Sequence, residues 1–259
     1  MRSQTLLLAS ALLAAPLGCA TPGPLVRLAP AGGEVTWVSG RAVLSKEQSG
    51  VRVAAAFEQQ NGDLLALRVE VDNQSEAKLE IRPDDVSFVA CKQQALSSCT
   101  VARRVVDPEA TLAALDARAS REAADAVNDR ALYTPLLILS VVGDVATMAS
   151  GKADSTTGLQ SVALANQMDH EAANHANALA SFGSHRQMWS NAALRRHTLH
   201  PGSTQGGLVF IPFDLSARYV WLQMRVGGVV FPFRFEQAVT QIGYATPPRT
   251  YTRGAPGYQ

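Results

Sequence analysis

A short alternation of apolar and polar residues in the N-terminal half constrains the fold of this chain more than any other feature. Apolar side chains occupy every second position from Leu65 to Val71, with Arg68 and Glu70 among the residues between them. A period of two residues is typical of a β-strand that buries one face. Residues 72–75 then supply turn chemistry before a second alternation begins. We expect the other strands of the chain to pair around this stretch.

Two hairpins can be predicted together with their registers. Gly227 and Gly228 suit a two-residue turn between strands that carry their large apolar residues on one face. The expected pairs are Val226 with Val229, Met224 with Phe231, Leu222 with Phe233 and Val220 with Phe235. In the N-terminal half, residues 60–62 are predicted to form a three-residue loop with Gly62 in the left-handed conformation. The expected pairs there set Phe57, Ala55, Val53 and Val51 opposite Leu65, Leu67, Val69 and Val71.

The hydrophobic period changes from two to about 3.6 residues after Asp107. Asp107 is a predicted helix cap, and Pro108 is the predicted first helical residue. The expected helices are one that begins there, a second at 131–151 with Pro135 near its start, a third at 156–182 ended by Gly183, and a short fourth that begins at Ser184.

Together these elements predict an α+β fold: an immunoglobulin-like antiparallel β-sandwich with a helical insertion between its two halves. The sandwich is assigned to residues 34–106 and 194–240, and the insertion to residues 107–193. Residues 19–33 are rich in proline, glycine and alanine and are expected to form a tether. Residues 241–259 have the composition of a disordered tail.

Motifs in both strand halves resemble a known sequence pattern. The first is the segment 67–72 followed by Asn73-x-Ser75, and the second is Leu199-x-Pro201-Gly202. The third is the run Gly207-Leu208-Val209-Phe210-Ile211-Pro212. They resemble the pattern V-x-V-x-N-x-S, L-x-P-G, G-x-V-x-F-x-P of immunoglobulin-like modules in bacterial lipoproteins and secreted proteins. The resemblance covers none of the helical block. It implies the fold and says little about activity, because such modules mostly bind other molecules or act as spacers.

The N-terminus has the features of an export signal. Met1-Arg2 is a minimal positively charged start, and residues 6–15 form a short apolar run. The following segment, Pro16-Leu17-Gly18-Cys19, resembles the lipobox of bacterial lipoproteins, with proline where that family usually has leucine. The resemblance implies that residues 1–18 are a signal peptide and that Cys19 is lipidated, so that the chain is held at a membrane.

Two further points concern the location of the mature chain. By analogy with the enteric sorting rule, the absence of aspartate at position 20 favours the outer membrane. The alternative to lipidation is cleavage after Ala20, which gives a soluble secreted chain.

Export changes what the remaining cysteines imply. Cys91 and Cys99 form an even pair, and an oxidising compartment favours a disulfide between them. Closing so short a loop contributes about 2 kcal/mol in the chain-entropy treatment, so the bond fixes a loop and does not hold the fold. A redox role is the weaker interpretation, because catalytic dithiols favour Cys-x-x-Cys spacing.

Charge and motif content argue against nucleic-acid binding and against catalysis. The chain has 23 Lys and Arg against 22 Asp and Glu, and Arg2 leaves with the signal segment, so the mature chain is neutral. Nucleic-acid binding depends instead on clustered positive charge. The segment His170-Glu171-x-x-x-His175 misses the H-E-x-x-H zinc motif by one residue. We therefore expect no metal, no cofactor and no catalytic residue.

An aromatic surface on the last hairpin is the candidate binding surface. Trp221 is expected opposite Arg234 on the outer face, where the two side chains form a cation–π pair. Trp37 and Tyr219 are expected to join them. The alternative is a sheet face covered by the helical insertion, because the insertion must bury its own apolar surface on something.

The sequence supports three hypotheses for function. The first is a lipid-anchored cell-envelope protein that acts as a non-catalytic binding or scaffolding module for an envelope protein partner, as part of an envelope-spanning machine. The second is a membrane-active or channel-associated protein that uses the apolar helix 131–151, in which Asp144 is costly near a bilayer centre. The third is an exported metal-dependent hydrolase, for which the sequence shows too few suitably spaced ligands.

Overall fold

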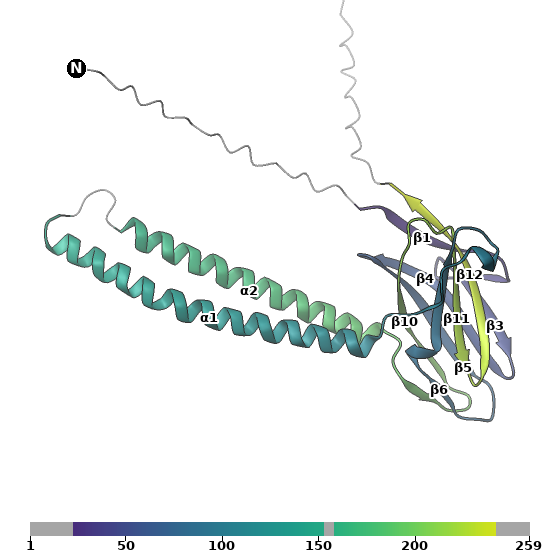
Figure 1. Cartoon of the computed structure of the whole chain (residues 1–259). Helices are drawn as coiled ribbons and strands as arrows, with labels where there is room; N and C mark the ends of the chain where they lie inside the picture. Colours follow the sequence, from purple (N-terminus) through teal and green to yellow (C-terminus); the bar gives the residue numbers. More distant parts are fainter. Residues whose placement is uncertain (1–22, 153–157, 242–259) are drawn as a thin grey trace, which may run out of the picture. The chain divides into compact units, whose positions relative to one another are not determined.

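Short strands and two long helices make up the structure (Figure 1). The computed structural model describes residues 23–152 and 158–241, and residues 26–238 form one compact unit. The predicted signal peptide, Cys19 and the predicted tail from residue 242 onward lie outside the described residues. The strands are β1 (Leu25–Pro30), β2 (Val35–Val38), β3 (Arg41–Gln48), β4 (Val51–Asn61), β5 (Leu64–Asn73), β6 (Leu79–Ile81), β7 (Val86–Cys91), β8 (Arg103–Arg104), β9 (His197–Leu199), β10 (Thr204–Pro212), β11 (Tyr219–Val226) and β12 (Val229–Thr240).

The strands assemble into two five-stranded sheets and one two-stranded ladder. One sheet has the order β1-β12-β11-β7-β8, the other has the order β10-β5-β4-β3-β2, and β6 pairs with β9. The pairs β4–β5, β5–β10, β7–β11 and β11–β12 are all antiparallel. The predicted α+β class, with antiparallel sheets and a helical segment inserted between strand regions, is confirmed.

One hydrophobic core is shared by the two five-stranded sheets. Leu65 on β5 is fully buried in it together with Leu222 on β11 and Phe233 on β12. The predicted alternation along β5 places its apolar residues in this core, while Arg68 and Glu70 stay exposed. Full burial of one large apolar side chain contributes about 1.5–3 kcal/mol, so this core is the main source of stability.

The register predicted for the β11–β12 hairpin is confirmed. Val226 pairs with Val229 across the turn Gly227-Gly228, and the three other predicted pairs follow in the same register. Both glycines have positive φ angles (58° and 83°), the region that a two-residue hairpin turn requires.

The register of the β4–β5 hairpin differs from the prediction by two residues. The turn is Gly62-Asp63, two residues rather than three, although Gly62 does take the predicted left-handed conformation (φ 57°). Phe57 consequently pairs with Leu67 rather than with Leu65. A β-bulge after Phe57 keeps the shift even, so the same side chains remain on the buried face.

The prediction of a tether at residues 19–33 is wrong for residues 25–30, which form strand β1 next to β12. Val26 and Leu28 are buried in the shared core, and the exposed Arg27 lies between them. The proline and glycine residues of the segment suggest a tether, but residues 25–30 contain a short apolar–polar alternation. They form a strand because the edge of β12 is available for pairing.

The helical insertion consists of two long helices and not of the four predicted ones (Figure 1). Helix α1 spans Pro108–Ala149, and helix α2 spans Leu159–Ala192. The start of α1 is as predicted: the Asp107 side chain accepts a hydrogen bond from the backbone N–H of Glu109 (2.9 Å). We call the pair α1 and α2 the hairpin, and the end nearest the sheets its base.

Two predicted helix boundaries lie inside these helices. Pro135 is in the interior of α1, and Gly183 is in the interior of α2 without a positive φ angle. In a helix interior, glycine is less favourable than alanine by about 1 kcal/mol and proline by about 3 kcal/mol. Contacts between α1 and α2 occur on both sides of each residue and offset that cost.

The hairpin joins the sheets through a second, smaller hydrophobic cluster. Trp189 of α2 and Phe210 of β10 lie with their ring centroids 4.2 Å apart. Leu112 and Leu115 of α1 pack into the same cluster, as does Ala66 of β5. The base of the hairpin therefore covers the outward face of β5 and β10, opposite the shared core.

A close backbone approach completes this junction. Just after α2, the backbone N–H of Leu194 donates to the carbonyl of Leu208 at 2.8 Å. A Cβ atom on Gly207 would lie 2.5 Å from the Cα atom of Leu194, so only glycine fits there. The glycine that opens the third sequence motif is thus explained by packing.

The predicted disulfide between Cys91 and Cys99 is present. Cys91 is the last residue of β7, and the bond closes a loop that contains the short 3₁₀ helix Leu96–Ser98. The backbone N–H of Lys92 also donates to the carbonyl of Ser98 at 3.3 Å, so the bond fixes the ends of a loop that is already hydrogen-bonded.

Two glycine substitutions test the junction and the continuity of α2. We expect Gly207→Ala to lower the free energy of unfolding by about 1–3 kcal/mol, because the new methyl group would collide with the backbone of Leu194. Gly183→Ala should instead raise it by about 0.5–1 kcal/mol, since this position is open space inside a helix. Urea unfolding followed by circular dichroism measures both. Destabilisation by Gly183→Ala would contradict a continuous α2.

Candidate functional site

The two helices of the hairpin meet along a seam whose residues recur every three or four positions, the spacing typical of paired helices. The buried or half-buried seam positions of α1 are Leu112, Leu115, Ala119, Glu122, Ala126, Asp129, Tyr133, Leu137, Ser140, Asp144 and Thr147. Those of α2 are Ser161, Leu164, Met168, Glu171, His175, Ala178, Phe182 and Trp189. The seam is apolar at the base and becomes largely polar away from it.

Hydrogen bonds between the helices add to the apolar contacts of Leu137, Leu164 and Met168 in the distal half of the hairpin. The carboxylate of Asp144 accepts from the Ser161 hydroxyl (2.6 Å) and from the backbone N–H of Gly158 (3.2 Å). Further toward the base, the side-chain amide of Gln167 donates to the Tyr133 hydroxyl (3.1 Å). Polar contacts therefore align the two helices here.

The densest group of ionisable side chains in the seam surrounds His175. Its Nδ1 lies 2.6 Å from Glu122 Oε1, and its Nε2 lies 3.0 Å from Asp129 Oδ2. Glu171, one helical turn earlier on α2, belongs to the same group. We call Glu122, Asp129, Glu171 and His175 the seam cluster. It places three carboxylates around one imidazole whose side chain is only 14% exposed.

The seam cluster changes the protonation of its histidine. The hydrogen bond to Asp129, and next the hydrogen bond to Glu122, raise the pKa of His175 above its ordinary value of 6.5. As an imidazolium, His175 donates to both carboxylates. As a neutral ring it has one N–H, so it can donate to only one of them.

Part of the seam cluster has the residue types and the proximity of a metal site. One ligand atom from each of Asp129, Glu171 and His175 lies within 4.8 Å of the others. The sequence motif shows only two of these, since Asp129 comes from the other helix. His170, the first residue of that motif, is exposed and outside the cluster. The signal that sequence reasoning missed is the seven-residue spacing of Glu122 and Asp129, which puts both on the seam.

The second notable feature is an exposed apolar surface that wraps around distal α1 outside the seam. We call it the outer face of α1; its exposed members are Leu132, Leu136, Ile138, Leu139, Val141, Val142, Val145 and Met148. Leu139 is 70% exposed. Within the described residues, α1 alone is long and apolar enough to cross a membrane by length and composition, with a window of mean hydropathy 1.6 of which 0% is buried. The predicted apolar stretch is thus exposed and not packed inside a helical bundle.

The outward surface of α2 alongside this region has a different character. Most of its exposed side chains are polar: Gln160, Asn166, Gln167, Asp169 and His170. Leu159, Val162 and Ala163, near the start of α2, are the apolar exceptions. The distal hairpin therefore has a largely polar seam, an apolar exposed surface on α1 and a mainly polar exposed surface on α2.

Only part of the predicted aromatic surface is brought together. Trp221 and Arg234 pair directly across β11–β12, and Arg234 Cζ lies 5.4 Å from the indole centroid, as predicted. Tyr219 is buried, and Trp37 is 72% exposed on β2, in the other sheet. Among the described residues, no ring contact or cation–π contact joins Trp37 to the other three.

The helical insertion does not cover this aromatic pair. The base of the hairpin packs on Ala66, Leu208 and Phe210, which belong to the other sheet. The Arg234 side chain instead lies against Gly32 and donates to the carbonyl of Ala31, in the segment that leaves β1. The cation–π pair therefore fixes the end of β1 against β12.

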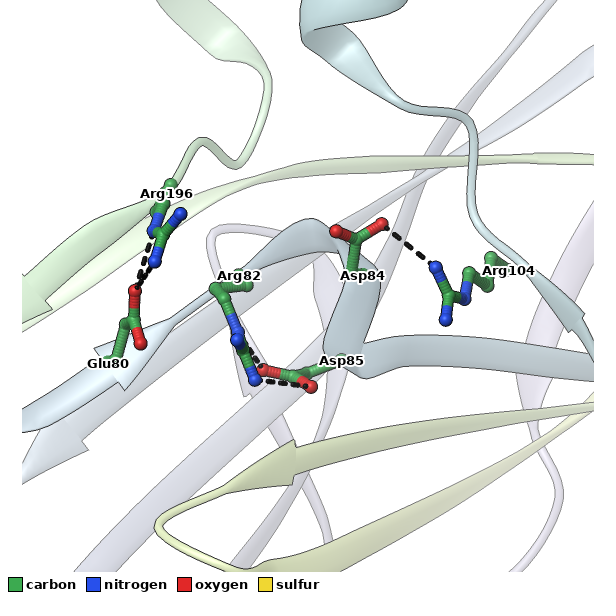
Figure 2. Close-up of polar contacts among 6 residues, drawn as sticks. All are labelled: Glu80, Arg82, Asp84, Asp85, Arg104 and Arg196. Carbon is green, nitrogen blue, oxygen red and sulfur yellow. Dashed lines mark hydrogen bonds and ion pairs between the residues drawn. The ribbon is translucent and has the colours of Figure 1, made fainter.

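Charged side chains near β6 form ion pairs between single partners (Figure 2). The pairs are Arg196 with Glu80, Arg82 with Asp85 at 2.8 Å, and Arg104 with Asp84 at 3.5 Å. The neighbouring carboxylates of Asp84 and Asp85 therefore turn to different arginines and do not form an acid–base pair. Solvent screens exposed pairs of this kind, so they are surface features and contribute little to stability.

Comparison of the chain with protein-family models and with curated proteins finds no match. The function is therefore inferred from the seam cluster and the outer face of α1.

The raised pKa of His175 predicts how the stability of the hairpin depends on pH. The stabilisation is complete below pH 6.5, where the imidazole is charged in both folded and unfolded chains. It is lost as the pH rises through the higher pKa of the folded state. Thermal unfolding by circular dichroism from pH 5.5 to 9, with a chelator present, should show this decline in the wild type and a weaker one in His175→Gln. Identical profiles would contradict the ion pairs.

Proposed function

We propose that the protein is a lipid-anchored, non-catalytic binding module of the bacterial cell envelope, held at the outer membrane. Its strands form an immunoglobulin-like sandwich, and its hairpin docks an envelope protein partner through the outer face of α1. The two sheets that share one core, together with the motifs at Asn73, Pro201 and Gly207, support the sandwich. The lipobox-like segment that ends at Cys19 supports the anchor.

The observation that carries the docking proposal is the exposure of large aliphatic side chains on the distal half of α1. In a self-contained pair of helices, apolar residues lie in the seam and polar residues lie outside. Here the seam of α1 holds Ser140, Asp144 and Thr147 beside a single leucine, Leu137, while Ile138, Leu139 and Val142 are exposed. Large contiguous exposed apolar surfaces mark sites of interaction with a protein or a membrane.

The partner we infer is a protein with an apolar helical groove, not the bilayer. Asp144 and Ser161 lie side by side, so insertion of the hairpin would carry the polar outer face of α2 into hydrocarbon as well. A charged residue such as Asp169 costs roughly 2.5–3.5 kcal/mol near a bilayer centre on insertion scales. Residues 159–185 also contain no Lys or Arg, the residues with which a surface helix binds anionic lipid.

The docking proposal is tested by site-specific photo-crosslinking in intact cells of the species that encodes the protein. We expect a photoreactive residue at Leu139, on the outer face of α1, to give one discrete protein adduct. The same residue at Ala173, exposed on α2, should give none. Val142→Asp should abolish the Leu139 adduct, because a buried carboxylate without a partner is strongly unfavourable at an apolar interface.

The controls separate loss of docking from loss of folding. Val142→Asp should change the free energy of unfolding by no more than about 0.5 kcal/mol, since Val142 is 59% exposed. The matched control is Val101→Asp, a more exposed valine outside the hairpin, which should leave the adduct intact. Adducts with lipid would show the membrane-active alternative to be correct, and adducts only with a second copy of the chain would replace the partner by self-association.

The anchor has its own test. Cys19→Ser should move the protein from the membrane fraction to the soluble fraction, because two or three acyl chains supply about 0.8 kcal/mol for each buried methylene. Mass spectrometry of the wild-type N-terminal peptide should find a lipid-modified residue 19. A soluble wild-type chain that begins at Thr21 would show that cleavage follows Ala20 instead.

A further inference from the structure

We propose that Asp129, Glu171 and His175 bind one divalent transition-metal ion of the Zn²⁺ class, which crosslinks α1 to α2. This inference goes beyond the docking function and does not depend on it. It begins from the position of the residues: all three lie on the seam, where side chains of paired helices are normally apolar. Charged groups at such positions are costly unless each has a partner.

The charges of the seam cluster favour a cation. Glu122, Asp129 and Glu171 bring three negative charges, and His175 brings at most one positive charge. A divalent ion between Asp129 and Glu171 balances the two carboxylates that would otherwise repel each other across the seam.

Glu122 prepares His175 to act as a ligand. His175 Nδ1 lies only 2.6 Å from Glu122 Oε1, so a metal bound at Nε2 would leave the ring proton on Nδ1, where it is donated to Glu122. The lone pair of Nε2 then points toward Asp129, whose Oδ2 is 3.0 Å away. A carboxylate that orients the ligating histidine in this way is the usual outer partner of protein zinc sites.

The distances require only a small adjustment. At the largest separation of 4.8 Å, an ion at the centre of the three ligand atoms lies about 2.8 Å from each. Bonds to zinc measure roughly 2.0–2.2 Å, so each side chain must move by about 0.6 Å. Glu171 and Asp129 are half-buried beside a cavity of about 520 Å³, which leaves room for this movement and for a bound water.

The ligand types select the metal. One imidazole nitrogen with two carboxylate oxygens suits Zn²⁺ and its neighbours in the first transition row. Ca²⁺ and Mg²⁺ prefer sets made of oxygen alone, and Mg²⁺ dehydrates reluctantly. We therefore expect selectivity for Zn²⁺ and Co²⁺ over Ca²⁺ and Mg²⁺.

The test uses the purified full chain without an affinity tag, stripped with a chelator. Calorimetric titration with ZnCl₂ should give one site per chain, and CoCl₂ should give visible absorption bands. His175→Ala and Asp129→Asn should each weaken binding at least tenfold. Glu122→Gln should weaken it about 10–100-fold with unchanged stoichiometry, because Glu122 acts through His175. The matched control is His170→Ala, five residues away on the exposed side of α2, which should bind as the wild type does.

A second measurement uses only the wild-type chain and therefore does not depend on the folding of a variant. X-ray absorption of the zinc-loaded wild type should show one imidazole nitrogen and carboxylate oxygens at about 2.0–2.2 Å. Absence of binding at 0.1 mM ZnCl₂, a first shell without imidazole, or equal affinity in His170→Ala and His175→Ala would each overturn the site.

Discussion

The burial of apolar residues from two strand regions in one core is the constraint on which the rest of the structure depends. Leu65 and Leu222 come from opposite sides of an insertion of more than eighty residues, yet both are fully buried in the same cluster. Because the entropy cost of loop closure grows only slowly with length, a long insertion is compatible with such a core. The shared core therefore forms without any residue of the hairpin. Only the base of the hairpin, at Trp189 and Phe210, is tied to the sheets.

The side chains of the distal hairpin are arranged in a way that the stability of the fold does not explain. Its seam is largely polar and charged, with few apolar residues, while most of the large aliphatic side chains of distal α1 are exposed on its outer face. We propose that the outer face of α1 meets an apolar partner surface and that the seam cluster holds a cation. The two are compatible, because a metal bond between the helices would hold α1 in the orientation that presents its outer face.

Local signals predicted structure well wherever they agreed with the contacts made later by distant parts of the chain. The Gly227-Gly228 turn and the flanking alternation fixed the β11–β12 register without help, and Asp107-Pro108 marked the start of α1. Prediction failed where distant contacts outweighed the local signal. Pro135 and Gly183 are absorbed into long helices by packing across the seam, and β1 forms because β12 offers an edge. Only part of the candidate site could be predicted, for the same reason. Glu171 and His175 are neighbours on one helix, whereas Asp129 is 46 residues from His175 in the sequence.

By itself, the sequence determined the class of fold, the place of the insertion, the disulfide pair and the identity of the apolar stretch at 131–151, because each follows from periodicity or spacing within a short segment. The tertiary structure alone decided which side of α1 meets α2, and hence that Leu139 and Val142 are exposed while Glu122 and Asp129 lie in the seam. The physical reason is that helical periodicity defines the faces of a helix but not the partner of each face. That choice is made only when the second helix, returning toward Leu194 and β10, packs against the first.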